Sequence, residues 1–214
     1  MVHINQVEFE NFKSFGGIVK VPLEEGFTVV TGPNGSGKSN ILDGILFCLG
    51  LASSRGMRAE RLPDLINTAK VKEGKSCETS VSVKFDIGDW SPREDTKDLD
   101  INEDELSFFK EQKEWTVSRK LRLMPGGSYA STYSSDGKSC TLQQIQKLLR
   151  DIRVDHEGSN VVMQGDVTRV DNGIFKPLGV SIESNKFSII LKGKLIYGLF
   201  KKNANSCQLI SLNQ

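Results

Sequence analysis

The chain has 214 residues, of which 37% are hydrophobic and 26% charged, and its formal net charge is +1. This composition is typical of a folded globular protein and excludes a disordered chain, and the near-zero charge gives no general argument for binding nucleic acid. The sequence has neither a signal-peptide pattern at its start nor a run of about 18 apolar residues, so we expect a cytoplasmic protein without a membrane partner.

Three segments with the residue pattern of strands open the chain. Alternating apolar residues predict a first strand from Ile4 to about Asn11, and Gly16-Gly17 predicts a turn after it. A second strand is expected over Ile18–Leu23 and a third over Phe27–Val30. The third segment leads directly into the most informative motif of the sequence.

This motif is a phosphate-binding loop. Residues 32–39 read Gly-Pro-Asn-Gly-Ser-Gly-Lys-Ser and fit the pattern G-x-x-x-x-G-K-[ST]. Its glycines let backbone N–H groups approach a polyanion, the Lys38 ammonium would lie between the β- and γ-phosphates, and the Ser39 hydroxyl would bind Mg²⁺. A strand pattern precedes the loop and helically spaced apolar residues follow it, as the motif requires. We therefore expect a nucleotide to be held by Gly32, Pro33, Asn34, Gly35, Ser36, Gly37, Lys38, Ser39 and Asn40.

The elements expected after the loop helix are mostly strands with one wet face. A basic segment, Ser54–Arg61, separates them from the helix. The capping box Thr141–Gln144 indicates the start of a later helix with an apolar face. The expected elements are a helical turn over 62–66, strands over 80–87, 115–123, 129–133 and 161–162, and a helix that runs from the capping box to residue 152.

An acidic excursion interrupts the strand pattern. Residues 86–114 contain eleven acidic and four basic side chains, and we expect a solvated, mobile insertion over about 88–113. The run Asp98-x-Asp100-x-Asn102 begins like a calcium loop, but Glu103 and Phe109 stand where that loop needs Gly and Glu. We therefore reject calcium binding there.

Several motifs in a fixed order resemble one family. The opening Glu10-Asn11-Phe12-Lys13-Ser14-Phe15, together with the phosphate loop, resembles the N-terminal head segment of structural maintenance of chromosomes (SMC) proteins. Met57-Arg58, with Asp64-Leu65-Ile66, is similar to the segment that carries the head arginine of that family. Residues 160–166, Asn-Val-Val-Met-Gln-Gly-Asp, look like its glutamine loop. The resemblance covers about residues 2–169 and is closest to prokaryotic members.

The resemblance implies an α/β fold, the N-terminal lobe of an ABC-type P-loop ATPase head. Such a lobe has a mixed sheet that carries the Walker A loop and its helix, plus an antiparallel sheet, here expected over 76–134. It also implies ATP and Mg²⁺ as cofactors, DNA as a partner, and a nucleoid-associated role in chromosome condensation and segregation.

The resemblance further assigns roles to single residues. Gln164 would complete the Mg²⁺ shell and help to place the attacking water, and Arg58 would stabilise charge on the triphosphate. Lys13 and Ser14 match positions beside the nucleotide. The residues that match the DNA-facing top of the head are Lys13, Arg119, Lys120 and Arg122.

These assignments have plainer alternatives, and Gln164 taken alone would be an ordinary loop amide. Arg58 lies close to Arg55 and Arg61, and the three side chains would also fit a solvated basic loop. Residues 119, 120 and 122 lie on an alternating strand, so at least two of them would equally fit its solvent-exposed face.

Two elements of an ABC-type head have no match in the sequence. We find no apolar strand followed by Asp-Glu, the Walker B motif, and no serine-glycine-rich signature loop. We therefore expect the isolated chain to be inactive as an ATPase, and expect hydrolysis to need a complementary SMC C-terminal head lobe or a full-length SMC dimer. The alternatives are a non-catalytic nucleotide- or DNA-binding fragment and a non-functional truncated product. A small kinase or GTPase is disfavoured because the chain has neither a Thr/Asn-Lys-x-Asp base-reading motif nor a lid-like arginine cluster.

The last part of the chain differs in composition from the rest. Residues 171–214 contain six lysines, no arginine and two acidic residues, and they show no heptads. We expect residues 1–170 to form the head lobe and residues 171–214 to be a tail outside the family, produced by a frameshift or truncation. The alternative is an accessory hairpin over Phe187–Leu191 and Lys194–Leu199.

Overall fold

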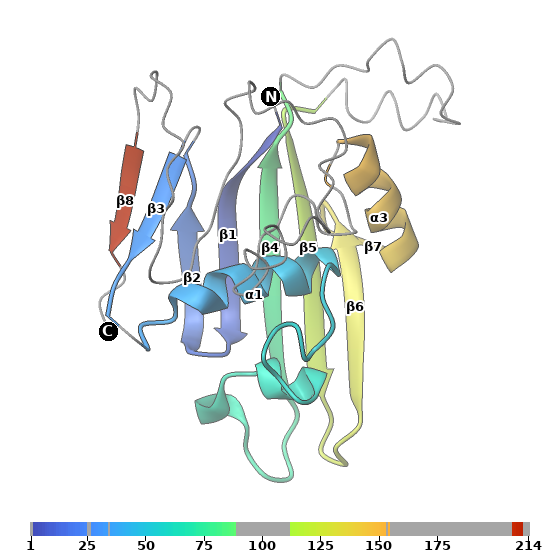
Figure 1. Cartoon of the computed structure of the whole chain (residues 1–214). Coiled ribbons are helices and arrows are strands. Elements are labelled where there is room, and N and C mark those ends of the chain that lie inside the picture. Colours follow the sequence, from blue (N-terminus) through green and yellow to red (C-terminus); the bar gives the residue numbers. More distant parts are fainter. Residues whose placement is uncertain are drawn as a thin grey trace, which may run out of the picture.

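The computed structural model of the protein describes residues 2–24, 27–33, 35–88, 112–152, 154 and 207–211. An antiparallel sheet of six strands, in the order β2-β1-β4-β5-β6-β7, forms the centre of the molecule, and β3 and β8 form a separate parallel pair (Figure 1). The elements are β1 (His3–Phe12), β2 (Phe15–Pro22), β3 (Phe27–Thr31), α1 (Lys38–Leu49), β4 (Cys77–Asp86), β5 (Glu114–Leu123), β6 (Tyr129–Ser135), β7 (Lys138–Cys140), α3 (Leu142–Asp151), β8 (Cys207–Ser211) and two 3-10 turns, Leu62–Leu65 and Thr68–Lys70.

Residue alternation gives the six-stranded sheet one dry and one wet face. In β4 the odd-numbered side chains from Thr79 to Phe85 are buried. In β5 the odd-numbered side chains from Trp115 to Leu121 are buried. The register places Phe9 of β1 opposite Val81, and Val81 opposite Arg119. These residues therefore share one cross-strand row on the dry face, because directly opposed residues point to the same side of a sheet.

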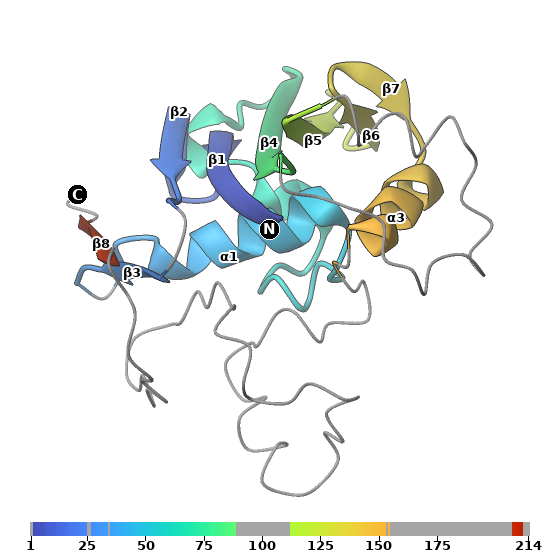
Figure 2. The same ribbon diagram turned by 90° about the horizontal axis from the view of Figure 1, so that it is seen from above.

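Helix α1 covers the dry face. It begins near β2 and runs across β1, β4 and β5, and Figure 2 shows it lying flat against one side of the sheet. Gly44 permits this close approach, because a Cβ at that position would overlap the buried ring of Phe9. Phe12 packs on Phe47 of the helix with ring centroids 5.6 Å apart. The buried core residues shared by helix and sheet are Val7, Phe9, Phe12, Ile41, Ile45, Leu46, Phe47, Leu49, Val81, Val83, Phe85, Trp115, Val117 and Leu121.

The α/β fold class predicted from the sequence is confirmed, and the strand pairing adds detail to it. Strands β1 and β2 extend the antiparallel sheet of β4 to β7 and do not pair with β3. The partner of β3 is β8, which comes from the end of the chain and was not predicted. The short strand β7 was also missed.

Several predicted features lie outside the described residues. They are residues 89–111 of the acidic excursion, the segment 160–166 with Gln164, the strand predicted over 161–162 and both segments of the alternative tail hairpin. Among the residues that the structure describes, no helix is long and apolar enough to cross a membrane.

Candidate functional site: the phosphate loop and the charged cluster beside it

The phosphate loop connects the end of β3 to the start of α1. Its glycines at 35 and 37 have φ angles of 86° and 87°, which favour glycine. Gly37 is also the N-cap residue of α1, and a Cβ there would lie 2.7 Å from the Ser14 hydroxyl oxygen. The loop therefore needs glycine at 37 both for its backbone and for its neighbour. Asn34 lies outside the described residues.

Lys38 folds back over the loop. Its ammonium donates hydrogen bonds to the carbonyl oxygens of Gly32 and Pro33, each at 2.6 Å. A phosphate in the loop would offer an anionic acceptor to the same ammonium, and charge-assisted hydrogen bonds are roughly twice as strong as neutral ones. The lysine thus lies where it can exchange carbonyl partners for phosphate.

Two further features of the loop fit an anionic ligand. The Ser36 hydroxyl is buried, yet it has no hydrogen-bond partner among the described residues. Buried polar groups are normally paired, so an additional acceptor or donor is expected there. The first turn of α1 contains no acidic residue, which leaves the positive end of the helix available for an external anion. The residues present therefore fit a nucleotide phosphate chain.

A buried carboxylate lies next to the loop and was not singled out from the sequence. The Asp43 side chain, in the second turn of α1, is 6% exposed. Its Oδ2 atom is 2.5 Å from the ammonium of Lys13, and it also accepts a hydrogen bond from Nη2 of Arg58. Lys13 donates in addition to the carbonyl oxygen of Met57. Two cations from separate segments thus meet on one side chain of the loop helix.

The turn between β1 and β2 is fixed in a way that aims Lys13 at this carboxylate. Asn11 and Lys13 both have left-handed backbone angles, with φ of 51° and 48°. The Lys13 N–H donates to the carbonyl of Leu65 at 2.8 Å. The Asn67 amide side chain donates to the carbonyl of Lys13 at 2.6 Å, and the Asn67 backbone N–H donates to the carbonyl of Asn11. Asn67 is a second residue that sequence reasoning missed.

Ser14 and Asn40 complete the group. The Asn40 amide donates to the Ser14 hydroxyl at 2.8 Å. Nη2 of Arg58 is 3.2 Å from the carbonyl oxygen of Ser39 and 3.5 Å from Oδ1 of Asn40. The structure therefore brings Lys13, Ser14, Asn40 and Arg58 together around the first two turns of α1.

Arg119 is a correction to the predicted DNA-facing residues. It is 9% exposed, its Nη1 donates to the carbonyl of Phe47 at 3.0 Å, and its Nε donates to the Ser131 hydroxyl at 2.8 Å. Its guanidinium lies between the rings of Phe47 and Tyr133, 4.4 and 4.7 Å from their centroids, and burial lowers its pKa. Arg119 is odd-numbered, like the other buried residues of β5. Its side chain therefore points into the core and does not face a ligand at the surface.

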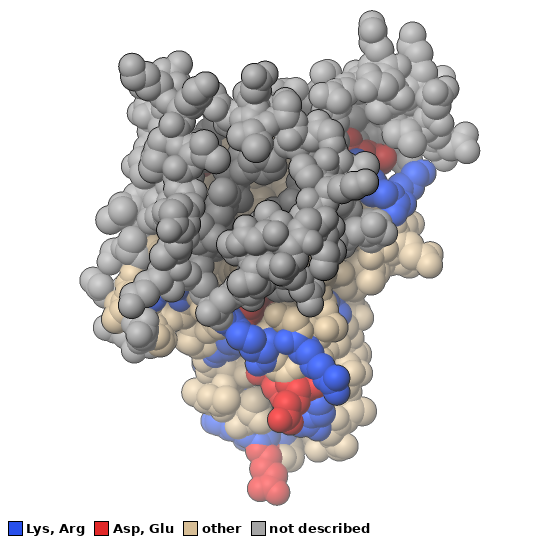
Figure 3. All heavy atoms as spheres, in the orientation of Figure 1, with Lys and Arg blue, Asp and Glu red and all other residues tan. Residues whose placement is uncertain are grey.

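The remaining residues of that group do not form one strip. Lys120 and Arg122 lie on the outer face of the sheet, 3.3 and 3.4 Å from the two carboxylate oxygens of Glu78, whereas Lys13 lies on the α1 side. Other cations of the outer face are also paired with acids, for example Lys84 with Glu114 at 2.7 Å. Figure 3, in the orientation of Figure 1, shows the α1 side of the molecule, and there too the blue and red side chains of the lower part lie next to one another.

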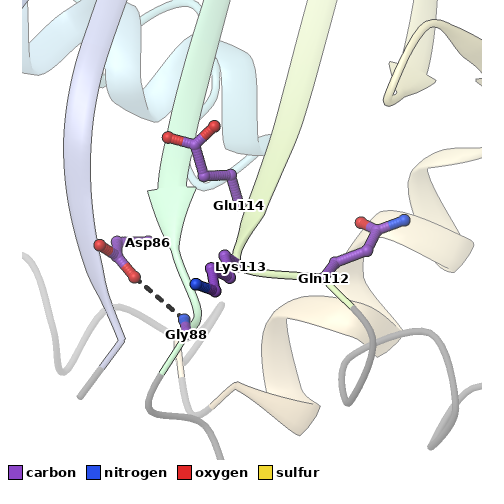
Figure 4. A pocket seen from close by; sticks show the side chains of 5 residues that line it. All are labelled: Asp86, Gly88, Gln112, Lys113 and Glu114. Atoms are coloured by element: carbon purple, nitrogen blue, oxygen red, sulfur yellow. Dashed lines mark hydrogen bonds between the residues drawn. The ribbon is translucent and has the colours of Figure 1, made fainter.

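A hollow at one end of β4 and β5 has two carboxylates in its lining, those of Asp86 and Glu114. It lies where the acidic excursion leaves β4 and returns to β5 (Figure 4). Asp86 accepts a hydrogen bond from the Gly88 N–H at 3.0 Å, and Glu114 is paired with Lys84. Both acids therefore have partners of their own, and we assign no catalytic role to them. The residues that line the hollow are Asp86, Gly88, Gln112, Lys113 and Glu114.

Comparison with known proteins identifies relatives over most of the chain. The family model described as RecF/RecN/SMC N terminal domain matches residues 3–173. A chromosome partition protein Smc from Synechococcus sp. is 53% identical over 172 residues, which are 79% of this chain and 14% of that protein. The Smc of Pyrococcus furiosus is 36% identical over 79% of this chain and 13% of its own length. The chain thus spans about a seventh of these relatives.

Solved structures agree with this relationship. The Smc head domain with an extended coiled coil, bound to the C-terminal domain of ScpA and derived from Pyrococcus furiosus, has a TM-score of 0.61 and 34% identity, covering 79% of this chain and 38% of that one. A structure described as "Structural biochemistry of ATP-driven dimerization and DNA stimulated activation of SMC ATPases" has a TM-score of 0.60 and 34% identity, covering 82% of this chain and 93% of that one.

Proposed function

The chain belongs to the RecF/RecN/SMC N-terminal domain family, and from this premise we propose that it is the ATP-binding half of a chromosome-partition ATPase head. The observation that carries the proposal is the loop at the start of α1, where Lys38 lies over the loop and the Ser36 hydroxyl is buried without a partner among the described residues. We propose ATP with Mg²⁺ as the ligand, and the nucleoid as the place of action.

The residues of this half have separate tasks in the proposal. Lys38 neutralises charge between the β- and γ-phosphates, and the Ser39 hydroxyl is a ligand for Mg²⁺, which supplies further charge neutralisation when bound. Arg58 lies beside the carbonyl of Ser39, which supports the proposal that its guanidinium contacts the same phosphates. Gln164, which lies outside the described residues, would orient the attacking water.

Hydrolysis is proposed to need a second lobe. The purified 214-residue chain should bind Mg·ATP but release phosphate near the background rate, because it has no candidate for the water-polarising Glu or the opposing signature loop. General-base help alone is worth about 10²–10⁴ in rate. Phosphate release should rise when a C-terminal Smc head lobe from one of the relatives is added.

The measurement is steady-state phosphate release with and without that lobe. Rapid turnover by the isolated chain that Lys38→Ala abolishes would mean that a catalytic carboxylate has been missed. No binding of Mg·ATP in a calorimetric titration would overturn the proposal itself.

DNA is proposed as the second partner, contacted through the exposed pair Lys120 and Arg122. Both cations already share Glu78, so this contact should be weak, blind to sequence and sensitive to salt. Replacing both by alanine should lower the slope of log affinity against log salt by about 2, since each phosphate contact contributes close to 1.

A fluorescence titration of duplex DNA at several salt concentrations measures this slope. Lys20→Ala is the matched control, because Lys20 lies on the same face and is paired with Glu8 at 2.9 Å on the opposite edge of the sheet. If the double variant and the control give the same slope as the parent, the DNA contact lies elsewhere.

A further inference from the structure

We propose that Asp43 is a positioning residue of the nucleotide site: it anchors the Arg58 guanidinium at the first turns of α1 so that the arginine can contact the phosphates. This inference rests on the proposed nucleotide site and adds a residue to it. Its basis is that Asp43, on the helix that follows the phosphate loop, forms ion pairs with both Lys13 and Arg58.

Within the described part of the chain, every hydrogen bond of the Arg58 guanidinium comes from its Nη2 atom. Nη2 donates to the Asp43 carboxylate, to the carbonyl of Ser39 and to Oδ1 of Asn40. A guanidinium has five N–H donors in a fixed planar fork. Anchoring at Nη2 therefore leaves the donors of Nη1 and Nε, which have no partner among the described residues, available for an anionic ligand.

The second cation explains how a buried carboxylate can serve this role. A carboxylate that is 6% exposed is costly to leave without a counter-charge. Lys13 is 12% exposed and is also held by the Met57 carbonyl, whereas Arg58 is 40% exposed. Lys13 is thus the more buried counter-charge of Asp43, so the carboxylate stays neutralised while it holds the more exposed guanidinium of Arg58.

The charges of the cluster also favour a phosphate chain. One carboxylate against one ammonium and one guanidinium leaves a net charge of +1, and Lys38 adds a further cation in the loop. The backbone supports the same arrangement: Met57 is fully buried, and Arg58 has a left-handed φ of 58°. The start of the Arg58 side chain is therefore fixed by the backbone, and its end is fixed by Asp43.

A double-mutant cycle tests whether Asp43 acts through Arg58. Mg·ATP affinity is measured with a fluorescent ATP analogue for the full chain and for Asp43→Asn, Arg58→Ala and the double variant. Asp43→Asn should weaken binding about tenfold when Arg58 is present and less than about twofold when Arg58 is alanine, because neighbouring groups that act together are not additive. The matched control Glu60→Gln, an exposed acid in the same segment, should leave the affinity unchanged.

The outcomes separate this inference from the proposed function. If the parent chain binds no Mg·ATP, the proposed function fails and the inference fails with it. If the parent binds but Asp43→Asn weakens binding equally in both backgrounds, Asp43 acts only through the fold and the inference alone is overturned.

A second variant covers the case in which Asp43→Asn does not fold. Arg58→Lys keeps the charge but has a single nitrogen, which cannot hold Asp43 and also present a fork of donors. It should therefore bind Mg·ATP as weakly as Arg58→Ala. Binding as tight as that of the parent would overturn the inference.

Discussion

Replacing Lys38 by alanine is expected to weaken Mg·ATP binding on the order of 10²-fold, since hydrogen bonds to charged groups contribute about 1.5–3 kcal/mol. The variant loses the ammonium that donates to the Gly32 and Pro33 carbonyls, which belongs to the one charged residue in the sequence of residues 32–39. Calorimetric titration of the purified chain with Mg·ATP measures the change, and a thermal melt of each variant checks the fold.

Lys72→Ala is the matched control for this experiment. Lys72 is an exposed lysine outside the loop, so its removal should change the affinity by less than about twofold. Equal affinities for the parent and Lys38→Ala would remove the phosphate loop from the proposed function, because no other feature among the described residues was assigned the same role.

Replacing Arg119 by methionine is expected to lower the free energy of unfolding by about 2–3 kcal/mol. The change removes two hydrogen bonds, to the Phe47 carbonyl and the Ser131 hydroxyl, and two cation–π contacts of about 0.5–1 kcal/mol or more each. Methionine retains part of the buried volume, so the cost comes mainly from the lost polar and ring contacts. Urea denaturation followed by circular dichroism measures it.

The control is the next residue of the same strand. Lys120→Met removes a cation from the exposed face and should change stability by no more than about 0.5 kcal/mol. If the two variants were equally stable, the polar and ring contacts of Arg119 would contribute little to the stability of the fold.

The strands and the phosphate loop could be predicted because their signals are local. Alternation in residues 80–87 and 115–123 marks one wet face, and the loop motif fixes both the strand before it and the helix after it. Arg119 could have been placed from the same alternation, because it stands at an odd position between Val117 and Leu121. The family resemblance predicted a DNA-facing surface position for Arg119, whereas the alternation of the strand indicated a buried one.

The charged cluster could not be predicted because it depends on contacts between distant segments. Asp43 lies among the apolar residues of α1, where a single acid has no evident partner in the sequence. Its partners come from the turn after β1 and from the segment before the first 3-10 turn. The place of Asn67 depends in the same way on the path of the backbone, and the pairing of β3 with β8 joins two distant parts of the chain.

Helix α1 has fixed attachments near both of its ends. It is 12 residues long, about 18 Å at 1.5 Å per residue. Near its start lie the phosphate loop and Asp43, and near its end the Phe47 carbonyl accepts a hydrogen bond from Arg119 of β5. A close-packed core transmits displacement with little compression. Helix α1 is therefore one continuous packed element that joins the phosphate loop at its start to Arg119 of β5 near its end.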